Sequence, residues 1–141
     1  MRKRTKAREC ALKILYQIDV LKVRNKFTRQ IDDFWLDNND GEDETVREFA
    51  NSLVNGVIEK LSIIDDKITS CADNWQISRM AIIDRNILRM AAFELLFLNE
   101  IPPKVSINEA VEIAKRYGDV DSGKFVNGIL DKINKTERKE D

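Results

Sequence analysis

Apolar side chains recur at steps of three and four residues along most of the chain, which is the spacing of one face of an α-helix. In the first helix the buried stripe is expected to hold Ala7, Ala11, Ile14, Ile18 and Leu21. A second row, at four-residue spacing, holds Arg4, Arg8, Leu12, Tyr16 and Val20. Residues four apart are neighbours on a helix surface. We therefore expect this helix to expose an apolar surface, topped by arginine, in addition to the face that enters the core.

The same spacing predicts six further helices and no strand. Their apolar stripes occupy residues 27–35, 46–61, 64–71, 80–98, 110–114 and 125–133. The stripe at 80–98 covers much of the helix circumference, so we expect that helix to be the central element. Gly118 is expected to end the sixth helix, and Gly128 predicts the close approach of a neighbour to the seventh. The predicted N-caps are Thr28, Ser62, Ser78, Ser106 (with Glu109 as a capping box) and Asp121 or Ser122.

The composition agrees with a helical bundle. The chain has 141 residues, of which 43% are hydrophobic, with only Gly 5 and Pro 2, whereas β-sandwiches need more turn residues. A single domain of this length buries roughly two thirds of the surface that it exposes when unfolded, so it needs no disulfide or metal to fold. Cys10 and Cys71 each fall in an apolar stripe, and we expect both to be reduced and buried.

The net charge is only −1, but charges of opposite sign are separated along the chain. Residues 32–48 carry eight acidic residues against the single Arg47, whereas the N-terminus is basic, with Arg2, Lys3, Arg4, Lys6 and Arg8. Such separation favours a binding function. A basic start can also be a disordered, solubilising segment. The register of the arginines with Tyr16 on one helix favours an arm that contacts phosphate.

The sequence offers no residues for catalysis. It contains no histidine, which removes the usual general base and the commonest metal ligand, and its two distant cysteines cannot form a zinc site. A glycine-rich phosphate loop and a nucleophile elbow are missing, and the consecutive Asp65 and Asp66 point in different directions, as solvated surface residues do. We expect a protein that is not an enzyme and has no cofactor or metal. With no secretory signal or membrane span, we expect it in the cytoplasm.

Several segments occur in an order that is typical of one family. Residues 8–11 are followed by Leu15 and Tyr16, and then by 87–91, 93–95 and 101–102. The most specific segments are VSINEAVEIAK at 105–115 and DSGKFVNGILD at 121–131. Over essentially the whole chain, the sequence resembles the NusB family of transcription antitermination factors.

The resemblance implies an all-α fold, a compact bundle of about seven helices arranged as two packed sub-bundles, 1–61 and 62–134, with a frayed tail at 135–141. It implies binding of boxA single-stranded RNA from ribosomal RNA leaders jointly with ribosomal protein NusE. That complex associates with elongating RNA polymerase and other Nus factors and suppresses termination. The RNA-binding positions are Arg4, Lys6, Arg8, Arg89, Asp121, Lys124 and Phe125, and the partner-binding positions are Leu12, Tyr16 and Asp84.

Other interpretations stay open from the residues alone. A DNA-binding regulator would need a basic interior helix, and the candidates around Arg79 and Arg85 are too mixed with apolar residues. An enzyme fragment, like the domain that fronts some ribosomal RNA cytosine methyltransferases, would need a cofactor loop and a catalytic cysteine downstream. The third alternative is a helical protein–protein adaptor without specific RNA binding, and only an RNA-binding assay distinguishes it from an RNA-binding factor. Tyr16 and Phe125 also fit core aromatics, and the row of Leu12, Tyr16 and Val20 could support a homodimer.

Overall fold

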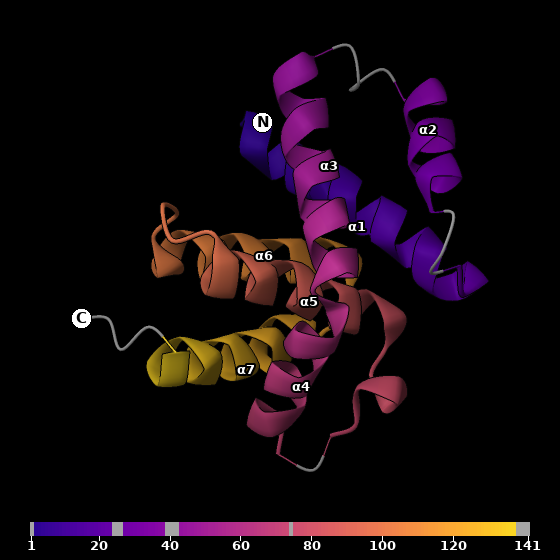
Figure 1. Ribbon diagram of the computed structural model, residues 1–141. Coiled ribbons are helices and arrows are strands. Elements are labelled where there is room, and N and C mark those ends of the chain that lie inside the picture. Colours follow the sequence, from indigo (N-terminus) through magenta and orange to yellow (C-terminus); the bar gives the residue numbers. More distant parts are fainter. Residues whose placement is uncertain (1, 24–26, 39–42, 74, 138–141) are drawn as a thin grey trace.

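The computed structural model describes residues 2–23, 27–38, 43–73 and 75–137, which form seven α-helices and one turn of 3₁₀ helix (Figure 1). In chain order these are α1 (Lys3–Leu21), α2 (Thr28–Leu36), α3 (Glu44–Glu59), α4 (Leu61–Cys71), η2 (Ile77–Arg79), α5 (Ile82–Phe97), α6 (Pro103–Tyr117) and α7 (Ser122–Glu137). The all-α fold that the apolar spacing predicts is confirmed.

The central helix is α5, as its apolar circumference predicts. It packs against α1, α3, α4, α6 and α7, and most of its side chains are buried. Figure 1 shows α1, α2 and α3 together above α5, with α4 and α7 below it. The α6 helix packs on both α5 and α7. The expected boundary at 61/62 falls at the junction of α3 and α4, and the division into units there stays a prediction.

Three of the predicted N-caps are wrong. Thr28 is the first helical residue of α2 and Ser62 lies inside α4, and neither helix has a side-chain cap. Ser78 lies in the 3₁₀ turn, and α5 begins only at Ile82, because the buried Met80 has an extended backbone. Water can satisfy the free amides of exposed helix starts. These helices therefore form without the caps that their sequences offer.

The capping box at Ser106 is also wrong, and the reason is tertiary. The α6 helix begins three residues earlier, at Pro103, and proline suits a first helical position because the missing amide would have no partner there. The Ser106 hydroxyl lies inside the helix and donates a hydrogen bond of 2.6 Å to Glu94 of α5. Glu109 accepts a hydrogen bond of 2.7 Å from Thr5 of α1. Both groups of the predicted box thus bind other helices.

The two glycines of α6 and α7 differ in how far they follow the prediction. Gly118 is the C-cap of α6, as predicted. Before α7, the Asp119 carboxylate accepts hydrogen bonds from the Asp121 amide and the Ser122 hydroxyl, and capping of α7 by Asp121 or Ser122 stays a prediction. Inside α7, no heavy atom of another described segment lies within 4 Å of where a Cβ on Gly128 would stand. The predicted close approach of another helix at Gly128 is therefore wrong.

The remaining expectations concern the thiols, the tail and the membrane. Cys10 and Cys71 are buried free cysteines, as predicted. Residues 135–137 belong to α7 and 138–141 lie outside the described residues, so the frayed tail stays a prediction. Across the ranges that the structure describes, no helix has the length and apolarity needed to cross a membrane.

Candidate nucleic-acid interface

The first turns of α1 form a basic surface. Arg2, Lys3 and Arg4 are exposed, and the first turn of the helix holds no acidic residue. The Arg4 guanidinium lies 4.3 Å from the centre of the Phe49 ring of α3. A cation–π contact of this kind holds the side chain without using its hydrogen-bond donors. Arg4 can therefore contact a phosphate while it stays packed on α3. Lys6, on the same helix, is half-buried.

One turn further along α1, Arg8 is buried. Its Nε and Nη2 donate hydrogen bonds of 2.8 and 2.9 Å to the two carboxylate oxygens of Glu94, whose side chain is 1% exposed. Its Nη1 lies 3.5 Å from a carboxylate oxygen of Glu109. A bidentate, charge-assisted pair is among the strongest polar contacts in a protein. In the structure Arg8 thus anchors α1 to α5 and α6, and its contact with RNA stays a prediction.

A groove of about 440 Å³ lies beside the basic turn. One of its walls is α1, with Arg4 and Thr5, and the other is the α5–α6 connection and the first turn of α6, with Pro102 and Val105. Two glutamates also line the groove: Glu100, and Glu109, whose carboxylate binds Thr5 and Arg8. The motif at 101–102 and the basic start, far apart in sequence, therefore meet in space. A groove with one basic and one apolar wall fits a nucleotide strand, since phosphates bind cations while unstacked bases bind apolar or aromatic groups.

The predicted partner-binding positions Tyr16 and Asp84 meet in a separate hollow of about 350 Å³. It is formed by α1, the start of α5 and the α6–α7 turn, including Tyr117 and Ser122. Arg4 and Tyr16 are twelve residues apart on α1, so the rise of 1.5 Å per residue separates the two regions by about 18 Å. The structure thus places both regions along one helix but does not merge them into one site.

Within this hollow, Asp84 carries a carboxylate oxygen without a partner. The residue is 8% exposed, and its Oδ1 makes no hydrogen bond to any residue that the structure describes. Burial raises the pKa of Asp84 above its ordinary value of 3.8, the Ser122 hydroxyl opposes this rise by hydrogen bonding, and the negative charge of Asp119 adds to it. A hydrogen-bond donor from another molecule would satisfy this carboxylate.

Two expectations for the apolar residues of α1 are wrong. Leu12, expected on the exposed row, is 1% exposed and belongs to the hydrophobic core, and Leu21, expected in the buried stripe, is 60% exposed. Tyr16 and Val20 are exposed as predicted, at 39% and 46%. Leu12 borders a hollow of about 520 Å³ between α1 and α2, where only its edge is accessible. Binding of a partner at Leu12 and formation of a homodimer stay predictions. The apolar area that α1 exposes for either contact is smaller than the residue spacing predicts.

The predicted positions on α7 differ in exposure. Asp121 and Lys124 are exposed, before and in the first turn of the helix, while Phe125 is half-buried and packs against the core. The ring of Phe125 contacts the ring of Trp75, with centroids 5.5 Å apart. Trp75 is the residue that the sequence reasoning missed. A large aromatic residue between two polar segments was the signal that could have identified it.

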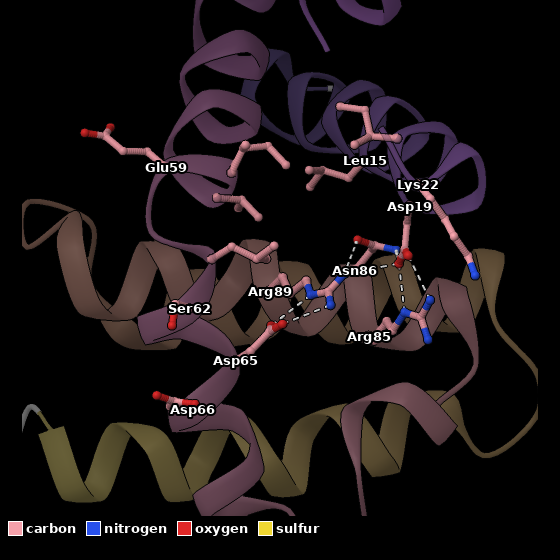
Figure 2. A pocket seen from close by; sticks show the side chains of 14 residues that line it. Leu15, Asp19, Lys22, Glu59, Ser62, Asp65, Asp66, Arg85, Asn86 and Arg89 are labelled. Carbon is pink, nitrogen blue, oxygen red and sulfur yellow. Dashed lines mark hydrogen bonds and ion pairs between the residues drawn. The ribbon is translucent and has the colours of Figure 1, made fainter. Parts of the chain in front are cut away.

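Arg89 holds three helices together, and Figure 2 shows it at the floor of a cavity of about 750 Å³. Its Nε and Nη2 donate hydrogen bonds of 2.9 and 3.0 Å to Asp65 of α4, and its Nη1 donates one of 3.1 Å to Asp19 of α1. The Arg89 side chain is 8% exposed. RNA contact by Arg89 stays a prediction, and its donors bind carboxylates of the protein itself.

The same cavity is also lined by three aspartates, Asp19, Asp65 and Asp66. Asp65 and Asp66 point apart, as predicted (Figure 2), but Asp65 pairs with arginine and is not a solvated surface residue. Burial raises the pKa of Asp19, yet the hydrogen bonds from Arg85 and Asn86 and the charges of the two arginines outweigh it and hold the pKa below its ordinary value. Arg85 donates to both Asp19 oxygens, at 2.7 and 2.8 Å.

Comparison with known proteins identifies the family. A model of the NusB family matches residues 5–135. The chain belongs to the NusB family. A transcription antitermination protein NusB from Trichlorobacter lovleyi is 50% identical over 130 residues, which span 92% of this chain and 89% of that protein. The resemblance found in the sequence is therefore confirmed.

Solved NusB structures share this fold. NusB from T. maritima matches with a TM-score of 0.84 and 40% sequence identity, over 94% of this chain and 90% of that chain. A structure of the antitermination factors NusB and NusE in complex with double-stranded RNA matches with a TM-score of 0.78 and 32% identity, over 96% and 98% of the two chains. The all-α NusB fold expected for this chain is thus confirmed.

Proposed function

We propose that this chain is a transcription antitermination factor that binds boxA-type single-stranded RNA of ribosomal RNA leaders together with ribosomal protein NusE. The complex associates with elongating RNA polymerase and other Nus factors and promotes processive elongation. The observation that carries the proposal is the exposed guanidinium of Arg4, packed on Phe49 beside a groove with one basic and one apolar wall. Membership of the NusB family and a NusB relative solved with NusE and RNA support it.

Single-stranded RNA suits this surface better than a duplex does. In an RNA duplex the bases are stacked and the sequence-bearing groove is deep and narrow, so sequence-specific proteins bind mostly unpaired nucleotides. In our proposal Arg2, Lys3 and Arg4 neutralise phosphates, with Lys3 exchanging its 3.4 Å ion pair with Asp43 for the RNA. Unstacked bases reach the apolar wall at Pro102 and Val105. If three phosphates are neutralised, a plot of the logarithm of the RNA binding constant against the logarithm of the salt concentration should have a slope of about −2.

NusE would be bound at the hollow that Tyr16 and Asp84 line. In our proposal the Asp84 side chain turns outward into the hollow, and its carboxylate, whose unpaired oxygen is buried in the free chain, accepts a hydrogen bond from a NusE donor. Because the two regions lie about 18 Å apart along α1, one extended strand that is bound at Arg4 can also reach a partner bound at Tyr16. Each ligand then strengthens the binding of the other, and by thermodynamic linkage both affinities change by the same factor.

Fluorescence anisotropy with a labelled boxA RNA and a scrambled RNA, with and without NusE, tests the proposal. We expect selective binding that tightens with NusE. Arg4→Ala should weaken it and reduce the magnitude of the salt slope by about 0.7, the contribution of one phosphate contact. Arg29→Ala is the matched control, because it removes an equally exposed positive charge from α2, and it should change neither quantity.

The opposite result is equally informative. Weak, equal binding of the two RNAs, unaffected by NusE and by Arg4→Ala, would contradict the proposal. It would favour the alternative of a helical protein–protein adaptor that does not bind a specific RNA.

A further inference from the structure

Trp75 is a half-exposed tryptophan on an ordered backbone. Its side chain is 50% exposed, while its backbone amide donates a hydrogen bond of 2.7 Å to the carbonyl of Ala72. It lies between α4 and the 3₁₀ turn, outside the groove and hollow described above. Tryptophan is highly buried on average, so a half-exposed indole offers an unusually large apolar face to another molecule.

The indole packs on Phe125 of α7. The two ring centroids are 5.5 Å apart and the ring planes meet at 71°, an edge-to-face geometry that aromatic pairs favour. Phe125 also packs against the hydrophobic core and exposes only part of its ring. Trp75 therefore offers the larger accessible aromatic surface of the pair, and Phe125 supports it from below.

The charges near this pair favour an anionic ligand. Arg79 and Lys124, close in sequence to the two aromatic residues, are exposed and form no ion pair within the described ranges of the chain. The carboxylate of Asp73 is bound by Lys132 at 2.8 Å, which offsets its charge. Exposed cations within four residues of an aromatic pair are typical of sites that bind single-stranded nucleic acid, where bases stack on rings and cations follow the backbone.

We propose that Trp75 stacks on an unpaired base of the bound RNA, and that Phe125 supports Trp75 instead of forming the stacking surface itself. This inference rests on the proposed function, because it gives the same RNA a further contact in the segment between α4 and α5. Any base can stack on an indole, so Trp75 contributes affinity more than sequence selectivity.

Tryptophan fluorescence tests the contact directly. The other tryptophan, Trp35, lies on α2 and donates a hydrogen bond to Asn51, so Trp35→Phe leaves Trp75 as the single tryptophan of the chain. We expect its fluorescence to be quenched as boxA RNA is titrated into the complex with NusE. The double variant Trp35→Phe/Trp75→Phe supplies the signal of NusE alone. Unchanged Trp75 fluorescence at RNA saturation would overturn the inference.

Affinity gives the second measurement. Trp75→Ala should weaken RNA binding by about tenfold, as the loss of one stacked base does, whereas Trp75→Phe should keep most of the affinity. Leu36→Ala, which removes an 82% exposed apolar side chain from α2, is the control and should have no effect. Thermal unfolding of each variant verifies that it is folded.

The two proposals fail in different ways. If the unmodified chain binds boxA RNA and Arg4→Ala weakens binding, but Trp75→Ala binds with unchanged affinity, the inference about Trp75 is wrong and the proposed function stands. If the unmodified chain does not bind boxA RNA selectively, both are wrong.

Discussion

Buried ion pairs determine which arginines of this chain can reach a ligand. The Arg8 side chain is 4% exposed and shares its donors between two carboxylates, whereas Arg4 is exposed and packs only on an aromatic ring. The attraction and hydrogen bonds within a buried ion pair offset the cost of taking both charges out of water, but removing one partner leaves the other unpaired in a medium of low dielectric constant. The two arginines should therefore differ sharply when they are substituted.

Arg8→Ala is expected to lower the free energy of unfolding by about 3–5 kcal/mol, because Glu94 would stay charged, buried and unpaired. Arg4→Ala loses an exposed cation–π contact and should cost less than about 1 kcal/mol. Urea unfolding at pH 7 measures both. Loss of RNA binding by an Arg8 variant can thus reflect unfolding, so Arg4 is the better residue with which to test binding.

The double variant Arg8→Met/Glu94→Gln is the control for Arg8. It removes both charges and keeps similar volumes, so it should recover part of the lost stability. If Arg8→Ala were as stable as Arg4→Ala, Arg8 would not be the anchor of α1.

At the scale of the helix, two glycines lie in opposite surroundings. A Cβ on Gly56 of α3 would lie 2.1 Å from the Phe93 ring of α5, so α3 approaches α5 closely because this residue has no side chain. Gly128 of α7 is exposed, with no atom within 4 Å of such a Cβ. One glycine is required by packing, and the other only weakens its helix.

Gly128→Ala is therefore expected to raise the free energy of unfolding by about 0.5–1 kcal/mol, since alanine is the better helix former. Gly56→Ala should lower it by about 1–3 kcal/mol, because the ring of Phe93 must move. Thermal and urea unfolding of the two variants measure this contrast. Destabilisation by Gly128→Ala would show that a tertiary constraint acts at this position after all.

The helices could be predicted from the sequence because their apolar spacing is a local property, and all seven lie where the stripes indicate. Helix starts could not, because tertiary contacts override local signals. Ser106 has the sequence of a cap, but its hydroxyl binds Glu94, while Asp43, which is not among the predicted caps, caps α3. A single Glu94 on the most apolar helix was a signal that a buried cation must pair with it.

The candidate site was predictable to a smaller extent. Spacing placed Arg4 and Arg8 on one helix face, but it could not separate an exposed arginine from a buried one, because Glu94 is 86 residues away in the chain. The position of Asp84 came from family resemblance and not from periodicity. Trp75 escaped notice because its contact with Phe125 joins two segments that the sequence does not connect.

For the molecule as a whole, two carboxylates make opposite contributions to the dependence of stability on pH. The lowered pKa of Asp19 stabilises the fold at pH values above the ordinary value of 3.8, and this contribution is lost as the pH falls through the folded-state pKa. The raised pKa of Asp84 means that its ionised form costs stability, and this cost is relieved as the pH falls through the folded-state pKa towards 3.8.

Asp84→Asn is therefore expected to be more stable than the unmodified chain at pH 7, with an advantage that disappears near and below pH 3.8. Asp19→Asn should be less stable at pH 7, and its deficit should shrink at low pH. Urea unfolding from pH 7 to pH 3 measures both differences. If Asp84→Asn gains stability but also loses affinity for NusE, the chain keeps a costly buried carboxylate because the partner needs it. If it gains no stability, the carboxylate is already satisfied in the free protein, and the hollow at Tyr16 would have no open acceptor to offer NusE.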